Sequence, residues 1–247
     1  IKVYCDATVT EILEEEGSLS CIITPNDGSG PVKTRAGQIL MAIGRRPDVS
    51  RLLGKDISLD MKDGKIAVDS DFETSEPGVY AIGDVAARTQ LAHVAAAQGT
   101  YVVEKIAGRP HSIKLEVVPN GMFVSLPIVP NCIYTDPEIA TVGITEEIAK
   151  KYGLKVRCGH FSMRDNGKSI ITGEEHGFIR LLFEAYSNTI VGAQMMCPRA
   201  TDMIGEIATA IANGLTAQEM SFAMRAQPTY NEGIGAAIED AMRQNPV

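Results

Sequence analysis

Residues 1–46 distribute apolar side chains in the way that β-strands do. Apolar and polar residues alternate over 7–13, a second short apolar run covers 20–24, and residues 38–44 form a continuous apolar run. A continuous run is expected of a strand that is buried on both faces. A segment this short with so little apolar surface is marginal as a free domain. We therefore expect residues 1–46 to be the tail of a larger domain.

Residues 47–83 are polar and rich in turns, and the apolar run over 79–84 ends on Gly83 and Asp84. This run predicts a second buried strand. From about 91 to 107 the apolar spacing becomes helical, and one side of the helix carries only small residues. These are Ala92, Ala95, Ala96 and Gly99. So smooth a face lets another backbone, or a flat ligand, approach closely.

Three prolines mark 111–130 as an irregular linker, namely Pro119, Pro127 and Pro130. Beyond the linker the pattern is that of an α+β unit, with strands predicted at 131–135 and at about 155–163, 177–184 and 189–197. Three further signals predict helices. They are a Thr145 cap followed by Glu146 and Glu147, an apolar stripe of Met203, Ile204, Ile207, Ala208 and Ile211, and a Thr216–Glu219 capping box.

The stretch 225–232 reads Arg-Ala-Gln-Pro-Thr-Tyr-Asn-Glu and precedes a helix that is rich in small residues. Pro228 suits the first positions of that helix, where its missing N–H would have no helical acceptor. Gln227 and Glu232 flank the turn. We expect their side chains to hydrogen-bond each other and to present one polar tip outward.

Composition narrows the class of protein. The chain has 247 residues, of which 45% are hydrophobic and 22% charged, and a net charge of −8. These values are ordinary for a globular protein, and the negative charge argues against a nucleic-acid partner. No apolar run is long enough to predict a membrane span.

The cysteines and histidines give no metal or redox motif. The five cysteines contain no Cys-x-x-Cys pair, and the four histidines are dispersed. Reduced, mostly buried thiols in a cytoplasmic protein are therefore expected, without a metal site.

A series of short motifs changes this picture when the motifs are taken in order. They are Ala42-Ile43-Gly44-Arg45-Arg46-Pro47, Val79-Tyr80-Ala81-Ile82-Gly83-Asp84, Leu91-Ala92-His93-Val94-Ala95, Tyr134-Thr135-Asp136-Pro137-Glu138-Ile139-Ala140, and Pro228-Thr229 with Glu232. In this order and spacing the chain resembles the C-terminal half of the flavin-dependent pyridine nucleotide–disulfide oxidoreductases. Among them it is most similar to the dihydrolipoamide dehydrogenases.

The resemblance implies a fold class of mixed α/β and α+β type in three parts. Residues 1–46 would be the remnant of the NAD-binding domain, 47–123 the central FAD-contacting region, and 124–247 an α+β interface domain with an antiparallel sheet and helices. The family's flavin fingerprint, redox-active cysteine pair and nicotinamide loop all precede the matching region. We therefore expect a fragment of an enzyme that uses FAD and NAD, with neither cofactor retained by this chain.

The resemblance also implies cofactor contacts around the second apolar run. Asp84, next to Gly83, would accept hydrogen bonds from the ribityl chain of the flavin, although a helix N-cap is an alternative role for this carboxylate. The backbone amides of the helix that begins at Leu91, near Ala92 and His93, would face the pyrimidine edge of the reduced flavin. For His93 the resemblance concerns the main chain, and its imidazole is expected to be an ordinary surface or core group.

Gln227 and Glu232 are the expected catalytic positions. In the family a histidine directly precedes the proline and, oriented by the glutamate, exchanges protons with the dithiol substrate. Here Gln227 occupies that position, and Arg225 replaces a second histidine that is often found upstream. Glutamine forms hydrogen bonds but does not titrate, so impaired dithiol turnover is expected. A natural paralogue with another electron acceptor and an introduced substitution both remain open.

The family further implies a homodimer through residues 124–247, carried by the apolar helix 200–213 and the sheet, and a 2-oxo acid dehydrogenase complex as partner. A glutathione reductase-like enzyme is the nearest alternative. A mercuric reductase-like enzyme is disfavoured because residues 243–247 hold no cysteine pair. A catalytically inert dimerisation module is the alternative from another class.

Overall fold

In a computed structural model the chain divides into two compact units, Ile1–Pro47 and Asp48–Val247. The structure describes residues 1–15, 17–49, 51–54, 57–87, 89–117 and 126–244.

The first unit is a three-stranded antiparallel sheet. Its strands are β1 (Ala7–Glu15), β2 (Ser18–Pro25) and β3 (Val32–Ala36), in the order β1-β2-β3. Both strands predicted from short apolar patterns are confirmed. Among the described residues of this unit, Ser20 alone is fully buried, so the sheet has no hydrophobic core of its own.

The predicted strand over 38–44 is wrong, because the segment forms no regular structure and is exposed. Leu40 and Ile43 are 91% and 87% accessible to solvent. A strand buried on both faces needs neighbouring strands and a cover on each side. In the described part of this unit, β1 to β3 pair without the segment and no second layer covers it.

Amide hydrogen exchange is expected to be much faster in this unit than in the sheet of the second unit. Protection follows buried apolar contacts, and β1 and β2 have few of them. Mass spectrometry of peptides covering 7–25 and 178–196 measures the difference. Equal protection of the two sets would contradict this expectation.

The second unit begins with two short strands, a 3-10 helix and one longer helix, and its first part holds a small core of Leu59, Ile66 and Ala81. The strands are β4 (Met61–Lys62) and β5 (Lys65–Ile66), and the helices are the 3-10 helix η1 (Gly83–Val85) and the helix α1 (Ala92–Ile106). The predicted helix over 91–107 is confirmed.

The strand predicted over 79–84 is wrong. Tyr80 makes only an isolated bridge to Glu73, and the chain then turns into η1. The turn follows from Gly83, whose positive φ of 65° takes the backbone out of the extended conformation.

The linker predicted over 111–130 is not wholly irregular. The two-residue strands β6 (Glu116–Val117) and β7 (Leu126–Pro127) pair antiparallel within it. Pro119 lies outside the described residues.

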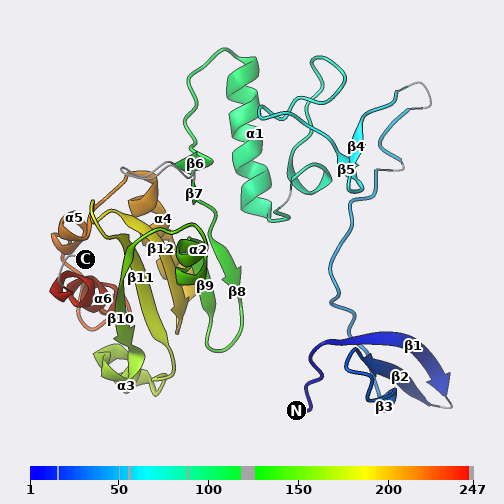
Figure 1. Cartoon of the computed structure of the whole chain (residues 1–247), viewed down its shortest axis with the longest axis horizontal. Helices are drawn as coiled ribbons and strands as arrows, with labels where there is room; N and C mark the ends of the chain where they lie inside the picture. The colour runs from blue at the N-terminus through cyan, green and yellow to red at the C-terminus, as the bar shows by residue number, and fades with distance from the viewer. Residues whose placement is uncertain (16, 50, 55–56, 88, 118–125, 245–247) are drawn as a thin grey trace. The chain divides into compact units, whose positions relative to one another are not determined.

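The remainder of the second unit is built on a five-stranded antiparallel sheet in the order β10-β11-β12-β9-β8 (Figure 1). The strands are β8 (Asn131–Ile133), β9 (Ile139–Gly143), β10 (Val156–Ser162), β11 (Phe178–Glu184) and β12 (Ile190–Met196). The helices are α2 (Glu146–Lys151), α3 (Gly167–Thr172), α4 (Ala200–Ala212), α5 (Ala217–Ser221) and α6 (Glu232–Arg243), with the 3-10 helix η2 (Met163–Asp165) between β10 and α3.

The predicted strands, the Thr145 cap and the Thr216–Glu219 capping box are confirmed. The strand β9 and the helix α3 were not predicted. Both are short, and α3 depends on Asn166, whose Oδ1 accepts the Ser169 N–H at 2.9 Å.

Helices cover both faces of the sheet. On one face α4 contacts β9 and β12, and α6 contacts β10 and β11. On the other face Ala149 of α2 packs against Leu182 and Val191. The apolar residues predicted as a stripe on α4, Met203, Ile204, Ile207 and Ile211, are buried in this chain's own core. These four side chains are therefore not exposed to a partner, and the expectation that helix 200–213 and the sheet carry a dimer interface stays a prediction.

Candidate functional site

Gly83 is the first residue of η1, and it contacts the helix α1. Its N–H donates to Oε1 of the buried Gln98 at 2.8 Å. A Cβ added at Gly83 would lie 2.9 Å from the Ala95 Cβ. Glycine is thus needed both for the left-handed backbone and for the close approach of the helix.

Part of the small-residue face of α1 accordingly packs against the segment just before Asp84. A Cβ added at Gly99 would lie 3.3 Å from Ile82 Cδ1, so Ala95 and Gly99 contact residues 82–83. Ala92 and Ala96, on the same face, are exposed.

Asp84 lies inside η1, whose N-cap is Ile82, without a side-chain cap. The alternative role of Asp84 as a helix N-cap is therefore wrong. Among the described residues no hydrogen bond or ion pair engages its carboxylate, which is half-buried. The carboxylate is available to accept hydrogen bonds from a ligand.

The first turn of α1, a helix that contacts η1, has backbone N–H groups that can donate hydrogen bonds. Leu91 is the N-cap, and its carbonyl accepts the N–H groups of Val94 and Ala95, both at 3.1 Å. The N–H groups of Ala92 and His93 lie in the first turn and have no acceptor within the helix. The N-terminal end of a helix also carries about half a positive charge. The His93 imidazole lies 2.9 Å from the Pro130 carbonyl oxygen through Nε2.

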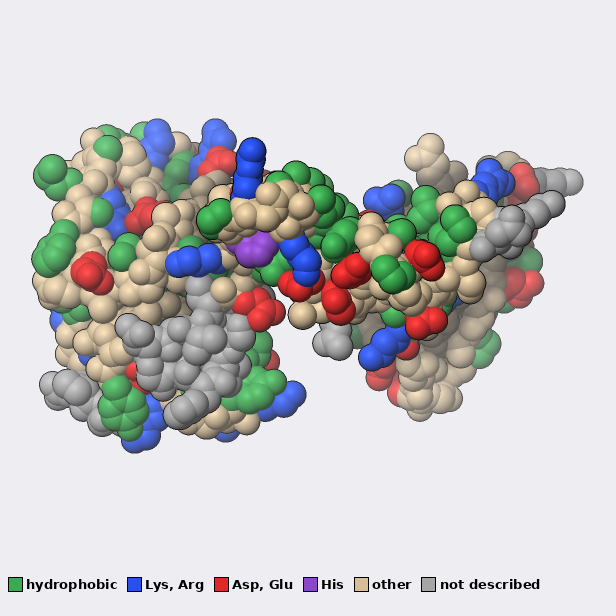
Figure 2. Space-filling view, turned by 90° about the horizontal axis from the view of Figure 1, so that it is seen from above, with side chains coloured by type: hydrophobic (Ala, Val, Ile, Leu, Met, Phe, Trp, Pro, Cys, Tyr) green, Lys and Arg blue, Asp and Glu red, His purple; other side chains and the backbone are tan. Residues whose placement is uncertain are grey.

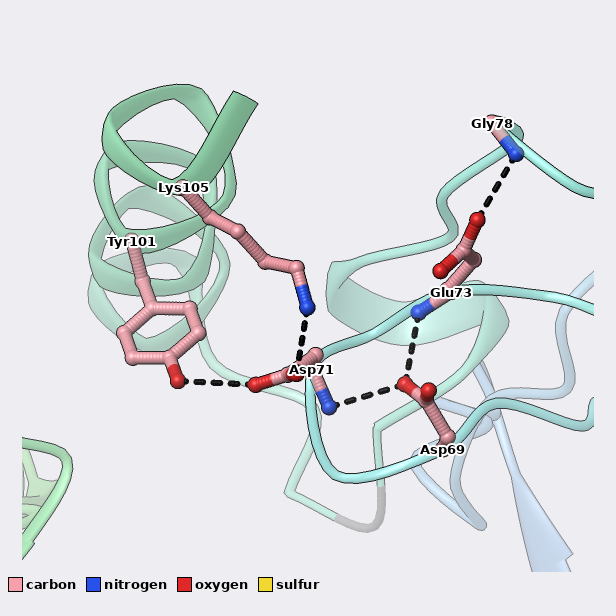
Figure 3. Close-up of polar contacts among 6 residues, drawn as sticks. All are labelled: Asp69, Asp71, Glu73, Gly78, Tyr101 and Lys105. Atoms are coloured by element: carbon pink, nitrogen blue, oxygen red, sulfur yellow. Dashed lines mark hydrogen bonds and ion pairs between the residues drawn. The ribbon is translucent and has the colours of Figure 1, made fainter. Parts of the chain in front are cut away.

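A polar network holds the loop before Gly83 to the far end of α1 (Figure 3). The Asp71 carboxylate accepts hydrogen bonds from Lys105 and, at 3.0 Å, from the Tyr101 hydroxyl. The Lys105 contact, followed by that of Tyr101, keeps the pKa of Asp71 below its ordinary value, and the same carboxylate raises the pKa of Lys105.

The loop is also tied to itself in this network. The Asp69 Oδ1 accepts the N–H groups of Asp71 and Glu73, and the Glu73 carboxylate accepts the Gly78 N–H at 2.7 Å (Figure 3). These contacts fix the loop that precedes Asp84.

The terminal stretch forms a separate group. Pro228 follows a cis peptide bond and lies outside α6, which begins at Glu232; its predicted place in the first helical turn is wrong. The Glu232 carboxylate accepts the Thr229 N–H at 2.9 Å. In the described structure this carboxylate takes no bond from Gln227, which is exposed. A first-turn carboxylate reaches back to its own turn more easily than to a side chain five residues earlier.

Two open clefts flank this turn. One, of about 620 Å³, is lined by Gln227, Glu232, Arg225, Glu239 and residues of β10, α3 and α5. The other, of about 660 Å³, lies on the side of Pro228, Thr229 and Tyr230. Asp84 lines neither of these two clefts.

Other chemistry is limited in the described residues. Burial raises the pKa of Cys158 to about 11 and that of Cys197 to about 12, so neither is a ready thiolate. No His, Cys, Asp and Glu cluster in the described ranges is arranged to hold a metal ion, and no described helix is long and apolar enough to span a membrane. Lys and Arg side chains are scattered over the face seen in Figure 2.

The sequence did not identify Gln98 or Glu206 as site residues. Gln98 is the polar side chain in the buried part of α1, and that position was its only signal. The Glu206 carboxylate accepts hydrogen bonds from the side chains of Arg225 and Asn231, and contacts between residues so far apart in the sequence have no local signature.

Two family models match the chain. Residues 1–99 match the pyridine nucleotide-disulphide oxidoreductase model, and 129–238 match the pyridine nucleotide-disulphide oxidoreductase dimerisation domain. Among curated proteins, the dihydrolipoyl dehydrogenase of Chlorobaculum tepidum is 32% identical over 243 residues, covering 98% of this chain and 50% of that protein. A dihydrolipoyl dehydrogenase of Bacillus subtilis is 35% identical over 203 residues, covering 82% and 40%.

Solved structures agree at the level of the fold. LpdA of Mycobacterium tuberculosis has a TM-score of 0.82 at 24% identity, over 96% of this chain and 48% of that one. The HOCl-induced flavoprotein disulfide reductase RclA of Escherichia coli has a TM-score of 0.80 at 17% identity, over 97% and 51%. The chain spans about half the length of the curated relatives it matches.

Proposed function

Because the chain belongs to the pyridine nucleotide–disulfide oxidoreductase family, we propose that it supplies the C-terminal half of a dihydrolipoyl dehydrogenase-like flavoenzyme. The whole enzyme passes electrons among a dithiol or disulfide, FAD and NAD. The observation that carries the proposal is the free carboxylate of Asp84 in η1, a 3-10 helix that contacts α1 through Gly83 and Ala95. We propose 1–46, 47–123 and 124–247 as its three functional parts.

The residues of the first group fit part of a flavin. Asp84 is an acceptor suited to the ribityl hydroxyls, and the Ala92 and His93 N–H groups suit an anionic ring edge. Bound flavin would supply two-electron redox chemistry. The described residues 1–47 hold no glycine-rich phosphate loop, so we assign no NAD contact to this chain and no step through NAD.

The terminal turn carries the second part of the proposal. Glu232 would orient the residue at position 227 for proton exchange with the dithiol. Gln227 holds a hydrogen-bonding group there but does not titrate. The proposal therefore includes weak dithiol turnover. Whether Gln227 marks another electron acceptor or an introduced change is decided by activity with each acceptor.

The whole enzyme would be a homodimer through 124–247, in a reducing, cytoplasmic compartment that suits five free cysteines. By the same resemblance we propose a 2-oxo acid dehydrogenase complex as its partner. A glutathione reductase-like enzyme is the alternative within the family, distinguished by its disulfide substrate. An inert dimerisation module would dimerise and bind no flavin in any assembly.

Flavin retention tests the proposal. The chain is joined behind the nucleotide-binding half of the Chlorobaculum tepidum relative, and absorbance near 450 nm is measured. Asp84→Ala removes hydrogen bonds to a charged acceptor, so roughly tenfold to hundredfold weaker flavin binding is expected. Asp60→Ala, at an exposed carboxylate of the same region, is the matched control. Equal retention by both variants would refute the role of Asp84.

Dimerisation gives a second measurement. Phe222 and Met224 are 71% and 100% exposed, and they alternate along the chain with Ser221, Ala223 and Arg225, which line the cleft beside Gln227. We expect Phe222→Ser with Met224→Ser to weaken the dimer about tenfold or more, because exposed large apolar residues are frequent anchors of interfaces. Val103→Ser on α1 is the control. Sedimentation that finds a monomer at micromolar concentration, or no change in the variant, would count against this interface.

A further inference from the structure

The Glu206 carboxylate hydrogen-bonds residues on both sides of the turn that contains Gln227. Glu206, on α4, accepts Arg225 Nη2 on Oε1 at 2.5 Å and Asn231 Nδ2 on Oε2 at 2.9 Å. Arg225 precedes the Gln227–Pro228 peptide and Asn231 follows it. The two ends of the turn are therefore held by one side chain from a neighbouring helix.

The Arg225 guanidinium is bonded to Glu206 and is not exposed to a ligand in solvent. Its side chain is only 9% exposed. A charge so far removed from water needs a close partner of opposite sign, which Glu206 provides. The side chain of Arg225 packs against Gly235 of α6. A Cβ added at Gly235 would be 3.5 Å from Arg225 Cδ and from Arg225 Nη1.

Further hydrogen bonds hold Thr229, within the turn. The Thr229 hydroxyl donates to the Ala226 carbonyl at 2.6 Å, and its N–H donates to Glu232. Asn166, which is buried, donates from Nδ2 to the Thr229 carbonyl at 3.1 Å. The backbone around Gln227 is thereby fixed while the Gln227 side chain stays exposed.

We propose that Glu206 is a positioning residue for position 227, and that Arg225 is the structural cation that engages it. Arg225 thus has a different role from the histidine that the family often places there. The proposal rests on the proposed function only for its catalytic consequence. Its geometric part concerns this chain alone.

Amide exchange of Thr229, measured by NMR on the 247-residue chain, tests the geometric part. Glu206→Gln removes the charge and one of the two acceptors, so exchange at Thr229 is expected to become about tenfold faster or more. Exchange at Leu181, in the sheet, should stay the same. Asp202→Asn, at an exposed ion pair on the same helix, is the control and should change neither amide.

Exchanging the two charges separates positioning from a loss of folding. Glu206→Arg together with Arg225→Glu restores an ion pair, and at least half of the lost protection at Thr229 is expected to return. Unchanged exchange in Glu206→Gln overturns the proposal. Unrestored exchange in the exchanged pair, with Leu181 still protected, overturns it as well.

The catalytic consequence is read in the joined enzyme that carries Gln227→His. Adding Glu206→Gln is expected to lower kcat about tenfold with KM unchanged, since the substrate site is not touched. Equal kcat with and without Glu206→Gln overturns the catalytic part. If Gln227→His itself brings no activity, the proposed function fails, whereas the Thr229 exchange result still decides the positioning role.

Discussion

Replacing Gln227 by histidine is expected to raise the dithiol-dependent rate of the joined enzyme by roughly 10²–10⁴-fold, the usual contribution of a general acid–base group. The backbone of the turn is already held, because the Glu232 carboxylate accepts the Thr229 N–H. What it lacks is a titrating group.

The pH profile should identify the gain. An imidazole with an ordinary pKa of about 6.5 accepts a proton only in its neutral form. The rate of the Gln227→His enzyme should therefore rise with pH through that region, whereas the rate of the Gln227 enzyme should not. Stopped-flow or steady-state rates from pH 5.5 to 8.5 measure the profile.

Two controls accompany the change. Gln218→His makes the same replacement at an exposed position of α5 and should leave the rate as it was. Adding Glu232→Gln to Gln227→His should remove most of the gain. A Gln227→His enzyme with the rate of its parent would show that position 227 does not exchange protons in this protein.

Replacing Gly159 by alanine is expected to destabilise the second unit by about 3 kcal/mol, as overpacking of a tight contact does. Gly159 lies on β10 beneath α6. A Cβ there would be 1.9 Å from the Ala237 carbonyl oxygen and 2.9 Å from the Ala241 Cβ. Both obstacles belong to the helix, one of them to its backbone, so the helix must shift as a body.

Gly205→Ala is the matched control, since an added Cβ at that position of α4 meets nothing within 4 Å. It should be neutral or stabilise the protein by about 0.5–1 kcal/mol, because alanine is the better helix former. Urea unfolding of the two variants measures both changes. Similar free energies of unfolding for the two would show that α6 yields to the added methyl group.

The elements predicted correctly from the sequence are those whose signals are local. The Thr145 cap, the Thr216–Glu219 capping box and the stripe on α4 each depend on residues within a few turns. The failures at 38–44 and 79–84 have the opposite character. A continuous apolar run indicates that burial would stabilise a segment, but it does not show whether other parts of the chain cover that segment.

The same distinction holds for the candidate site. The motifs placed Gly83, Asp84 and the start of α1 next to one another along the chain, and the structure adds Gln98 as the group that fixes Gly83. The expected Gln227–Glu232 hydrogen bond is replaced by one to the Thr229 N–H. A backbone donor in the same turn competes with any side chain, and residue identity does not reveal the competition.

Because the apolar stripe of α4 is buried within its own chain, we expect a protomer to stay folded without a partner. The side chains of Ile204, Ile207 and Ile238 in the main core cluster are already buried by residues of this chain. An obligate dimer loses its fold when the protomers part. Here dilution should release a protomer that is still folded, with near-native circular dichroism. Below the dissociation constant of the dimer, its melting temperature should no longer depend on concentration.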